Sequence, residues 1–183
     1  IMVENEDNYV ITSIINDFMN VPESIQAVCR DMTNFNRKGK SMNPSLVKHF
    51  ICETKRTLAF LAQYGFTCDE KSIEITPLLI RMPYLGKNIA IILSYDDRDQ
   101  TVDCAVAKIC NGVIIRNKTE GGYWSPLYSY LINHQGFRGC IGSRDRPNPN
   151  KIEDRLSLAL DDYAKALQKH GQAILSDQKN ALP

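Results

Sequence analysis

The stretch Lys87–Arg116, KNIAIILSYDDRDQTVDCAVAKICNGVIIR, decides the fold of this chain. It contains two apolar runs, Ile89–Tyr95 and Val102–Cys110, in which β-branched residues are frequent. The polar segment Asp96–Gln100 separates the runs and consists of residues that tolerate turn geometry. The pattern therefore predicts two antiparallel strands joined by a short charged turn.

Further strands are predicted on both sides of this pair. Asn111-Gly112 is a strong hairpin signal, because both residues accept the positive φ of a type I′ turn, and the short apolar run Val113–Ile115 follows it. Upstream, Ile73–Met82 predicts strand on either side of Pro77, a residue that belongs at a sheet edge. The result is an antiparallel meander of about four strands, with Val102–Cys110 in its interior.

Helical spacing of apolar residues flanks the sheet region. Asn43 predicts a cap for a helix over Pro44–Tyr64 that ends at Gly65, and a second long helix is predicted over Ile152–His170. The spacing of apolar residues changes at Gly65 from the helical period to the alternation of a strand, and it becomes helical again after Ser125. We therefore predict an α+β fold whose amphipathic helices pack on one face of the meander.

Length and composition favour one globular domain. The chain has 183 residues, 43% of them hydrophobic and 23% charged, enough to form a sizeable core. We predict a single domain over residues 1–183, with a helical N-terminal extension at 1–42 and a core at 43–175. The net charge of +1 argues against a general nucleic-acid binder. No apolar run is long enough to span a membrane, and no signal peptide is recognised at the start.

The cysteines predict a reducing environment. No pair has Cys-x-x-Cys spacing, and no Cys/His series has zinc-site spacing. We expect reduced, buried thiols and a cytoplasmic protein. The six cysteines are Cys29, Cys52, Cys68, Cys104, Cys110 and Cys140.

Four carboxylates are crowded at the central hairpin. Asp96, Asp97, Asp99 and Asp103 lie within one short segment, and a hard cation needs several such oxygens. The glycine and closing glutamate of a helix-loop-helix calcium site are missing, and Arg98 adds a positive charge. We therefore expect an exposed, hydrated turn that serves recognition or solubility, and no metal site.

Other combinations of polar residues are weaker candidates for a functional site. Asp103 and Lys108 do not have the acid-x-lysine spacing of a metal-dependent nuclease, and His134 has no serine or cysteine in a nucleophile-elbow context. His49 is expected at the edge of the core or on the surface, and not as a metal ligand. One basic concentration beside Phe137 remains open between a phosphate or acidic-partner contact and an ordinary loop. It comprises Arg138, Arg144, Arg146, Lys151 and Arg155.

Four segments together resemble a known group of proteins. They are LAFLAQYGF (Leu58–Phe66), KNIAIILSYDDRDQTVDCAVAKI (Lys87–Ile109), WSPLYSYLI (Trp124–Ile132) and YAKALQKHGQAIL (Tyr163–Leu175). The arrangement resembles a broad group of small bacterial cytoplasmic proteins of largely unassigned role. That group includes immunity proteins of toxin–immunity, contact-dependent inhibition systems. The resemblance covers Leu46 to Leu175 and carries no catalytic residues.

The resemblance and the missing catalytic set lead to one main hypothesis. We expect a non-enzymatic protein that binds a protein partner, such as the toxin domain that an immunity protein neutralises, without a cofactor. Nucleic acid and membranes are not expected as partners. The expected binding residues are Tyr95, Asp96, Asp97, Arg98, Asp99, Tyr123, Trp124, Arg138, Arg144 and Arg146.

The alternative is a small enzyme or nucleic-acid-acting protein that uses the Asp96–Asp103 carboxylates or the Arg138–Arg155 loop. A cleft that joins these two regions would favour the alternative. A convex, well-hydrated hairpin tip would favour the binding protein.

Overall fold

The computed structural model describes residues 42–115, 122–138, 150–176 and 181–182. The chain divides into two compact units, Ile1–Ser41 and Met42–Pro183, and all described residues belong to the second. The helical extension predicted at residues 1–42 thus lies outside the described residues except for Met42, and so do Cys29, Cys140, Arg144 and Arg146.

The first long helix is α-helical over only part of its predicted length. Helix α3 covers Pro44–Thr57, and Asn43 caps it as predicted, its side chain accepting a backbone hydrogen bond of 3.0 Å from the first turn. The chain then tightens into the 3₁₀ helix η1, Ala59–Tyr64. Gly65 ends this helix with a φ of 82°, the left-handed conformation that glycine adopts without steric cost.

The predicted α+β class is confirmed, but the described sheet has seven antiparallel strands instead of about four. Their order is β1-β3-β4-β5-β6, with β2 also beside β3 and β7 also beside β5. The interior position predicted for Val102–Cys110 is confirmed, because β5 pairs with β4 on one side and with β6 and β7 on the other. The strands are β1 (Thr67–Cys68), β2 (Glu74–Ile75), β3 (Leu79–Leu85), β4 (Ile89–Asp96), β5 (Thr101–Cys110), β6 (Val113–Ile115) and β7 (Trp124–Pro126).

The end predicted for the strand before Pro83 is wrong. Strand β3 continues through Pro83, whose carbonyl accepts a hydrogen bond of 3.2 Å from the Asp69 backbone. In an antiparallel pair the N–H and C=O of one residue point to the same side. The missing N–H therefore faces the gap between β1 and the short strand β2, and no ladder bond is lost.

The two central hairpins form as the sequence predicts. Tyr95 pairs with Val102 and Asp96 with Thr101 before the first turn. In the second turn, Asn111 and Gly112 have φ values of 52° and 77°, the two positive angles of a type I′ turn.

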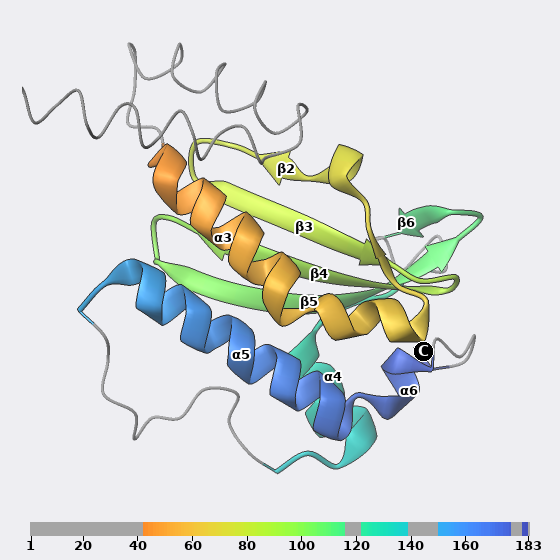
Figure 1. Ribbon diagram of the computed structural model, residues 1–183. Helices are drawn as coiled ribbons and strands as arrows, with labels where there is room; N and C mark the ends of the chain where they lie inside the picture. The colour runs from red at the N-terminus through yellow and green to blue at the C-terminus, as the bar shows by residue number, and fades with distance from the viewer. Residues whose placement is uncertain (1–41, 116–121, 139–149, 177–180, 183) are drawn as a thin grey trace, which may run out of the picture. The chain divides into compact units, whose positions relative to one another are not determined.

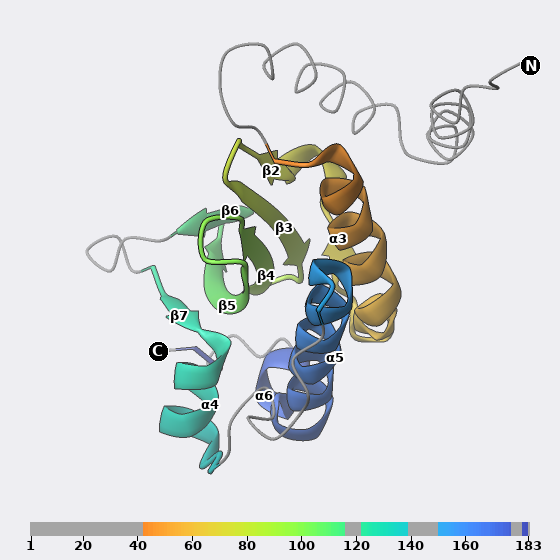
Figure 2. The same cartoon turned by 90° about the vertical axis from the view of Figure 1, so that its left-hand side faces the viewer.

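The two long helices cover one face of the sheet, as predicted (Figures 1 and 2). Helix α5 spans Ile152–His170 and lies beside α3. The Phe50 and Tyr95 rings are 6.0 Å apart between centroids. The Tyr84 hydroxyl donates to the carbonyl of Thr54 at 3.3 Å, and the Tyr163 hydroxyl donates to that of Val102 at 3.2 Å. These contacts join both helices to strands of the same face.

A second, smaller apolar cluster lies on the opposite face. The pairing of Ala90 with Ala107 places both side chains on that face, where each is fully buried. Trp124, on β7, packs against this cluster. Strand β4 is therefore buried on both sides, which explains why its sequence is continuously apolar from Ile89 to Leu93. The cluster comprises Ala90, Ile92, Ala107 and Ile109, with Leu85, Ile114 and Trp124 packed around it.

Three short helices complete the described part of the unit. Helix α4, Leu127–Gln135, buries Leu127, Tyr130 and Leu131. Helix α6 spans Gln172–Leu175, and the 3₁₀ helix η2 spans Glu70–Ser72. Among the described helices, none is both long enough and apolar enough to cross a lipid bilayer.

Candidate protein-binding surface

The turn between β4 and β5 is held by its own side chains. Asp96 accepts a hydrogen bond from the backbone N–H of Arg98 at 2.9 Å. The guanidinium of Arg98 folds back onto the same carboxylate, with Nε 3.2 Å from Oδ1 and Nη2 2.7 Å from Oδ2. Three donors of one residue thus fix one carboxylate, and the turn has a defined shape before any partner arrives.

A buried tyrosine supports the next carboxylate. The Tyr95 side chain is fully buried, and its hydroxyl donates to Asp97 Oδ1 at 3.2 Å. The backbone N–H of Asp97 donates to the carbonyl of Leu78 at 2.9 Å, which joins this turn to the turn between β2 and β3. The sheet core therefore positions Asp97 from below, and a second turn positions it from the side.

The start of α5 is joined to the same turn. Arg155 Nη2 donates to Gln100 Oε1 at 2.6 Å. Arg155 Nε is buried and lacks a hydrogen-bond partner among the described residues. Gln100 has a φ of 53°, so the turn closes through a left-handed residue just before β5 begins.

These contacts define what we call the hairpin-tip surface: Leu78, Asp96, Asp97, Arg98, Asp99, Gln100 and Arg155. Leu78 is 40% exposed, one of five large apolar side chains that are exposed in the described part of the chain. Arg98, Asp99 and Gln100 are exposed as well, whereas Asp96, Asp97 and Arg155 are half-buried. The surface thus combines one exposed aliphatic side chain with polar groups, several of which are held by hydrogen bonds.

The electrostatics of the tip follow from these contacts. The side-chain and backbone hydrogen bonds from Arg98 hold the pKa of Asp96 at about 2, below its usual value. Burial, followed by the nearby carboxylate of Asp97, raises the pKa of Tyr95. At neutral pH the Asp96 carboxylate is therefore ionised and the buried Tyr95 phenol is neutral.

The carboxylates of the hairpin do not gather around one point. Side chains alternate between the two faces along a strand, so Ser94 and Asp96 lie on the face opposite that of Tyr95 and the helices. Asp103 pairs with Ser94 and therefore lies on the same face as Asp96. Asp97 is turned toward Tyr95 instead. Among the described residues, no group of three or more His, Cys, Asp and Glu side chains is placed to hold a metal ion.

Several predicted binding residues have other surroundings than expected. Tyr95 was predicted as a binding residue, but β4 places its ring in the helix-facing core, where the side chain is fully buried. Trp124 packs on the second cluster and, like Tyr123, is only half-exposed. Arg138 is exposed, and Arg155 points to Gln100. Leu78 was not predicted as a binding residue; its place directly after Pro77, in a break between two strands, was the signal available in the sequence.

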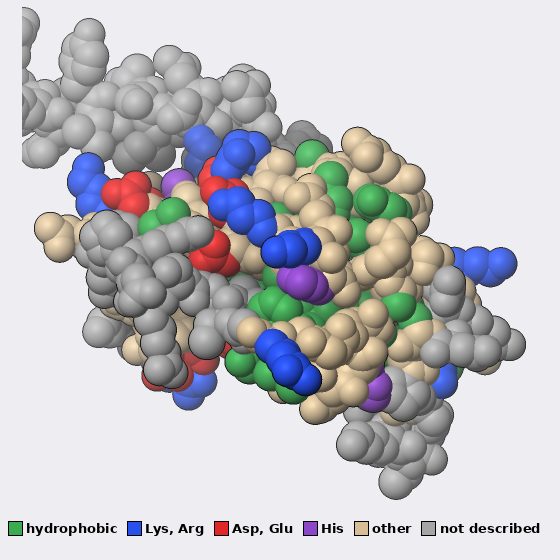
Figure 3. Space-filling model, turned by 90° about the horizontal axis from the view of Figure 1, so that it is seen from below, with side chains coloured by type: hydrophobic (Ala, Val, Ile, Leu, Met, Phe, Trp, Pro, Cys, Tyr) green, Lys and Arg blue, Asp and Glu red, His purple; other side chains and the backbone are tan. Residues whose placement is uncertain are grey.

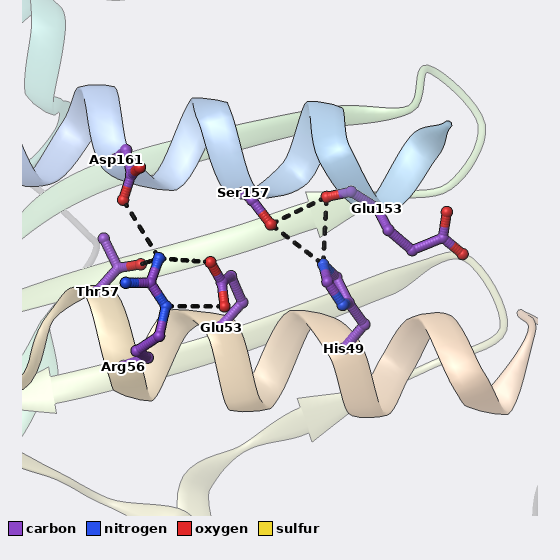
Figure 4. Close-up of polar contacts among 7 residues, drawn as sticks. All are labelled: His49, Glu53, Arg56, Thr57, Glu153, Ser157 and Asp161. Atoms are coloured by element: carbon purple, nitrogen blue, oxygen red, sulfur yellow. Dashed lines mark hydrogen bonds and ion pairs between the residues drawn. The ribbon is translucent and has the colours of Figure 1, made fainter. Parts of the chain in front are cut away.

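A polar seam joins α3 to α5 on the outer side of the helix layer (Figure 4). His49 Nε2 lies 3.1 Å from the carbonyl oxygen of Glu153 and 3.2 Å from Ser157 Oγ. A carbonyl oxygen only accepts, so this nitrogen carries the proton and donates. It cannot then serve as a base toward Ser157 through the same nitrogen, and the contact is a link between helices. The place predicted for His49 at the edge of the core agrees with its half-buried position.

The seam continues through Arg56 (Figure 4). Its guanidinium donates to both carboxylate oxygens of Glu53, at 2.6 and 3.0 Å, and lies 3.5 Å from Asp161 on α5. The hydrogen bond from Arg56 is the main reason that the pKa of Glu53 is lowered. This part of the seam is more exposed than the His49 link and contributes less to stability.

The four described cysteines are free thiols. Cys104 is buried in β5, and burial raises its pKa well above the usual range. Cys68 and Cys110 are half-buried, but Cys52 is exposed on α3, so the prediction of burial is wrong for Cys52.

No known protein family, curated protein or solved structure matches this chain.

Proposed function

We propose that this chain is a non-enzymatic binding protein and that the hairpin-tip surface recognises a protein partner. The observation that supports this most is the built-in support of Asp97. A fully buried tyrosine donates to its side chain, and a neighbouring turn accepts from its backbone, at the point where Leu78 is exposed. Groups that are already ordered lose little conformational entropy on binding, so such a surface is suited to tight contacts.

The charges of the tip indicate the chemistry of the partner. Asp96–Gln100 contains three carboxylates and one guanidinium, and Asp96 is already paired with Arg98. Asp97 and Asp99 remain as the acceptors available to a partner. A complementary surface carries lysine or arginine around an apolar depression that receives Leu78.

We propose further that the partner is a toxin domain and that this protein is the immunity protein that neutralises it in the cytoplasm. The resemblance of Leu46–Leu175 to the group that includes immunity proteins motivates this step. Free thiols at the four described cysteines agree with a reducing compartment.

The experiment uses the protein encoded next to this chain as the first partner to test. Its C-terminal domain is titrated with the full-length chain by calorimetry, and its toxicity is measured with and without co-expression of this chain. We expect a stoichiometric complex and loss of toxicity. The variant Asp97→Lys/Asp99→Lys should abolish both, whereas Asp161→Lys/Asp162→Lys, the same charge change in the middle of α5 and outside the hairpin-tip surface, should abolish neither. Equal effects of the two variants would overturn the assignment of the tip.

A further inference from the structure

Helix α4 exposes a second apolar stripe. Its inward face is Leu127, Tyr130 and Leu131, yet Tyr128 and Ile132 are 37% and 40% exposed. Positions four apart lie on the same side of a helix, so these two side chains form one continuous exposed stripe. The packing of α4 on the sheet therefore uses only one of its two apolar sides.

Aromatic side chains extend this stripe to the end of α5. The chain leaves α4 through Gly136, whose φ is 64°, and the backbone of Phe137 donates to the carbonyl of Leu131 at 3.1 Å. The Phe137 ring is thereby fixed between two others. It meets Tyr128 edge to face at 6.0 Å between centroids and His170, the last residue of α5, at 4.8 Å.

Basic residues lie in both segments that contribute to this stripe, and Asp161 and Asp162 lie one turn before them on α5. The described segments 127–138 and 163–176 contain Arg138, Lys165 and Lys169 but no aspartate or glutamate. All three cations are exposed. Seen from below, lysine or arginine and histidine side chains lie among hydrophobic ones over the middle of the molecule, while acidic side chains gather toward one end (Figure 3).

We propose that this second surface docks an acidic segment of another protein. We call it the aromatic–basic surface: Tyr128, Ile132, Phe137, His170, Arg138, Lys165 and Lys169. An apolar or aromatic residue of the segment packs on Tyr128 and Ile132, and its carboxylates face the three cations. The exposed aliphatic Ile132 favours a protein over a nucleic acid, because bases bind by stacking on rings and the Phe137 ring is engaged edge to face on two sides.

This inference does not rest on the hairpin-tip surface. Arg155 of the tip lies in the first turn of α5, whereas Lys165, Lys169 and His170 lie in its last turns, about 15 to 22 Å further along the helix axis. The two surfaces therefore share no residue and lie toward opposite ends of α5.

The test uses a fluorescein-labelled octapeptide that has two phenylalanines among acidic residues. Controls are the same peptide with Gln and Asn in place of Glu and Asp, and a labelled single-stranded oligothymidylate. Anisotropy is measured with the full-length chain, and amide chemical shifts map the site. We expect the acidic peptide to bind, with shifts concentrated in residues 127–138 and 165–172, and the neutral peptide to bind at least about tenfold more weakly.

Matched variants separate this site from general charge attraction. Lys165→Glu/Lys169→Glu should weaken binding of the acidic peptide at least about tenfold, whereas Lys71→Glu/Lys151→Glu, an identical charge change at other exposed lysines, should not. Tyr128→Ser should weaken it without a change of charge. The proposal is overturned if the acidic peptide does not bind, if both double variants weaken it equally, or if the oligothymidylate binds more tightly.

Discussion

Tyr95 donates its hydroxyl to the Oδ1 atom of Asp97, two residues further along the chain, at 3.2 Å. The ring that carries this hydroxyl is fully buried and lies against Phe50 of α3. One side chain therefore belongs both to the core and to the tip of the hairpin. Through it, the packing of the helix layer determines where an exposed turn presents its carboxylate.

The first prediction concerns this link. Tyr95→Phe keeps the buried ring and removes only the hydroxyl, so unfolding in urea should show a loss of about 1 kcal/mol. Asp97 should lose its fixed position, so the backbone amides of the tip should exchange faster in Tyr95→Phe than in the original chain. Tyr130→Phe, which removes a hydroxyl that donates to Ala181 instead, should leave exchange at the tip unchanged. Equal exchange at the tip in all three proteins would contradict this role of Tyr95.

The second prediction concerns the carboxylate of Asp96. Carbon-detected NMR titration should find its pKa at about 2, because Arg98 donates to it through side chain and backbone. Arg98→Ala removes the side-chain donors but keeps the backbone N–H, so the pKa should rise only part of the way to its usual value. Since the folded-state pKa is lowered, the associated stability is present above pH 4 and is lost as the pH falls toward 2. An unchanged pKa in Arg98→Ala would show that the pair does not persist in solution.

The third prediction concerns alkaline pH. Burial raises the pKa values of Tyr84, Tyr95 and Tyr163 above the usual value near 10. Above pH 10 the unfolded chain releases protons that the folded chain retains, so the stability contributed by these groups is lost as the pH rises. Denaturation measured from pH 8 to 11 should show that the free energy of unfolding falls. Ultraviolet absorbance should show that these three phenols ionise at a higher pH than ordinary tyrosines. Stability that is flat across this range would contradict their burial.

The fourth prediction concerns the seam between α3 and α5. A double-mutant cycle of His49→Ala and Ser157→Ala should give a coupling energy of about 0.5–1 kcal/mol, because the contact is partly buried. The cycle of Arg56→Ala and Asp161→Ala should give less than about 0.5 kcal/mol, since this pair is exposed and 3.5 Å apart. The reverse order of the two couplings would contradict the view that the His49 link is the stronger one.

Local sequence signals predicted much of the central sheet. Asn111-Gly112 forms the second hairpin because its conformation depends on those two residues alone. Strand β7 was missed because its three residues are ordered only by pairing with β5, a contact distant in the sequence. Likewise, nothing local to Pro83 shows that its missing N–H faces a gap between two short strands.

The sequence predicted the carboxylates of the hairpin-tip surface but not the residues that hold them in place. Tyr95 shares its strand face with Leu93, which is fully buried, and this alternation was the signal that it belongs to the core. Leu78 joins the surface only because the turn that contains it is hydrogen-bonded to Asp97. Such a contact between two turns follows from the register of β3 and β4, which the sequence does not specify residue by residue.

Site-specific photo-cross-linking tests the central claim most directly. A benzophenone amino acid replaces Leu78 in the full-length chain, and in a control it replaces Val113, an apolar residue that is 62% exposed on the other hairpin. Illumination with the neighbouring-gene protein should give one adduct from position 78 and none from position 113. The adduct should disappear when Asp97→Lys/Asp99→Lys is added. Equal adducts from the two positions, or an adduct from position 78 that survives this charge reversal, would contradict recognition through the hairpin-tip surface.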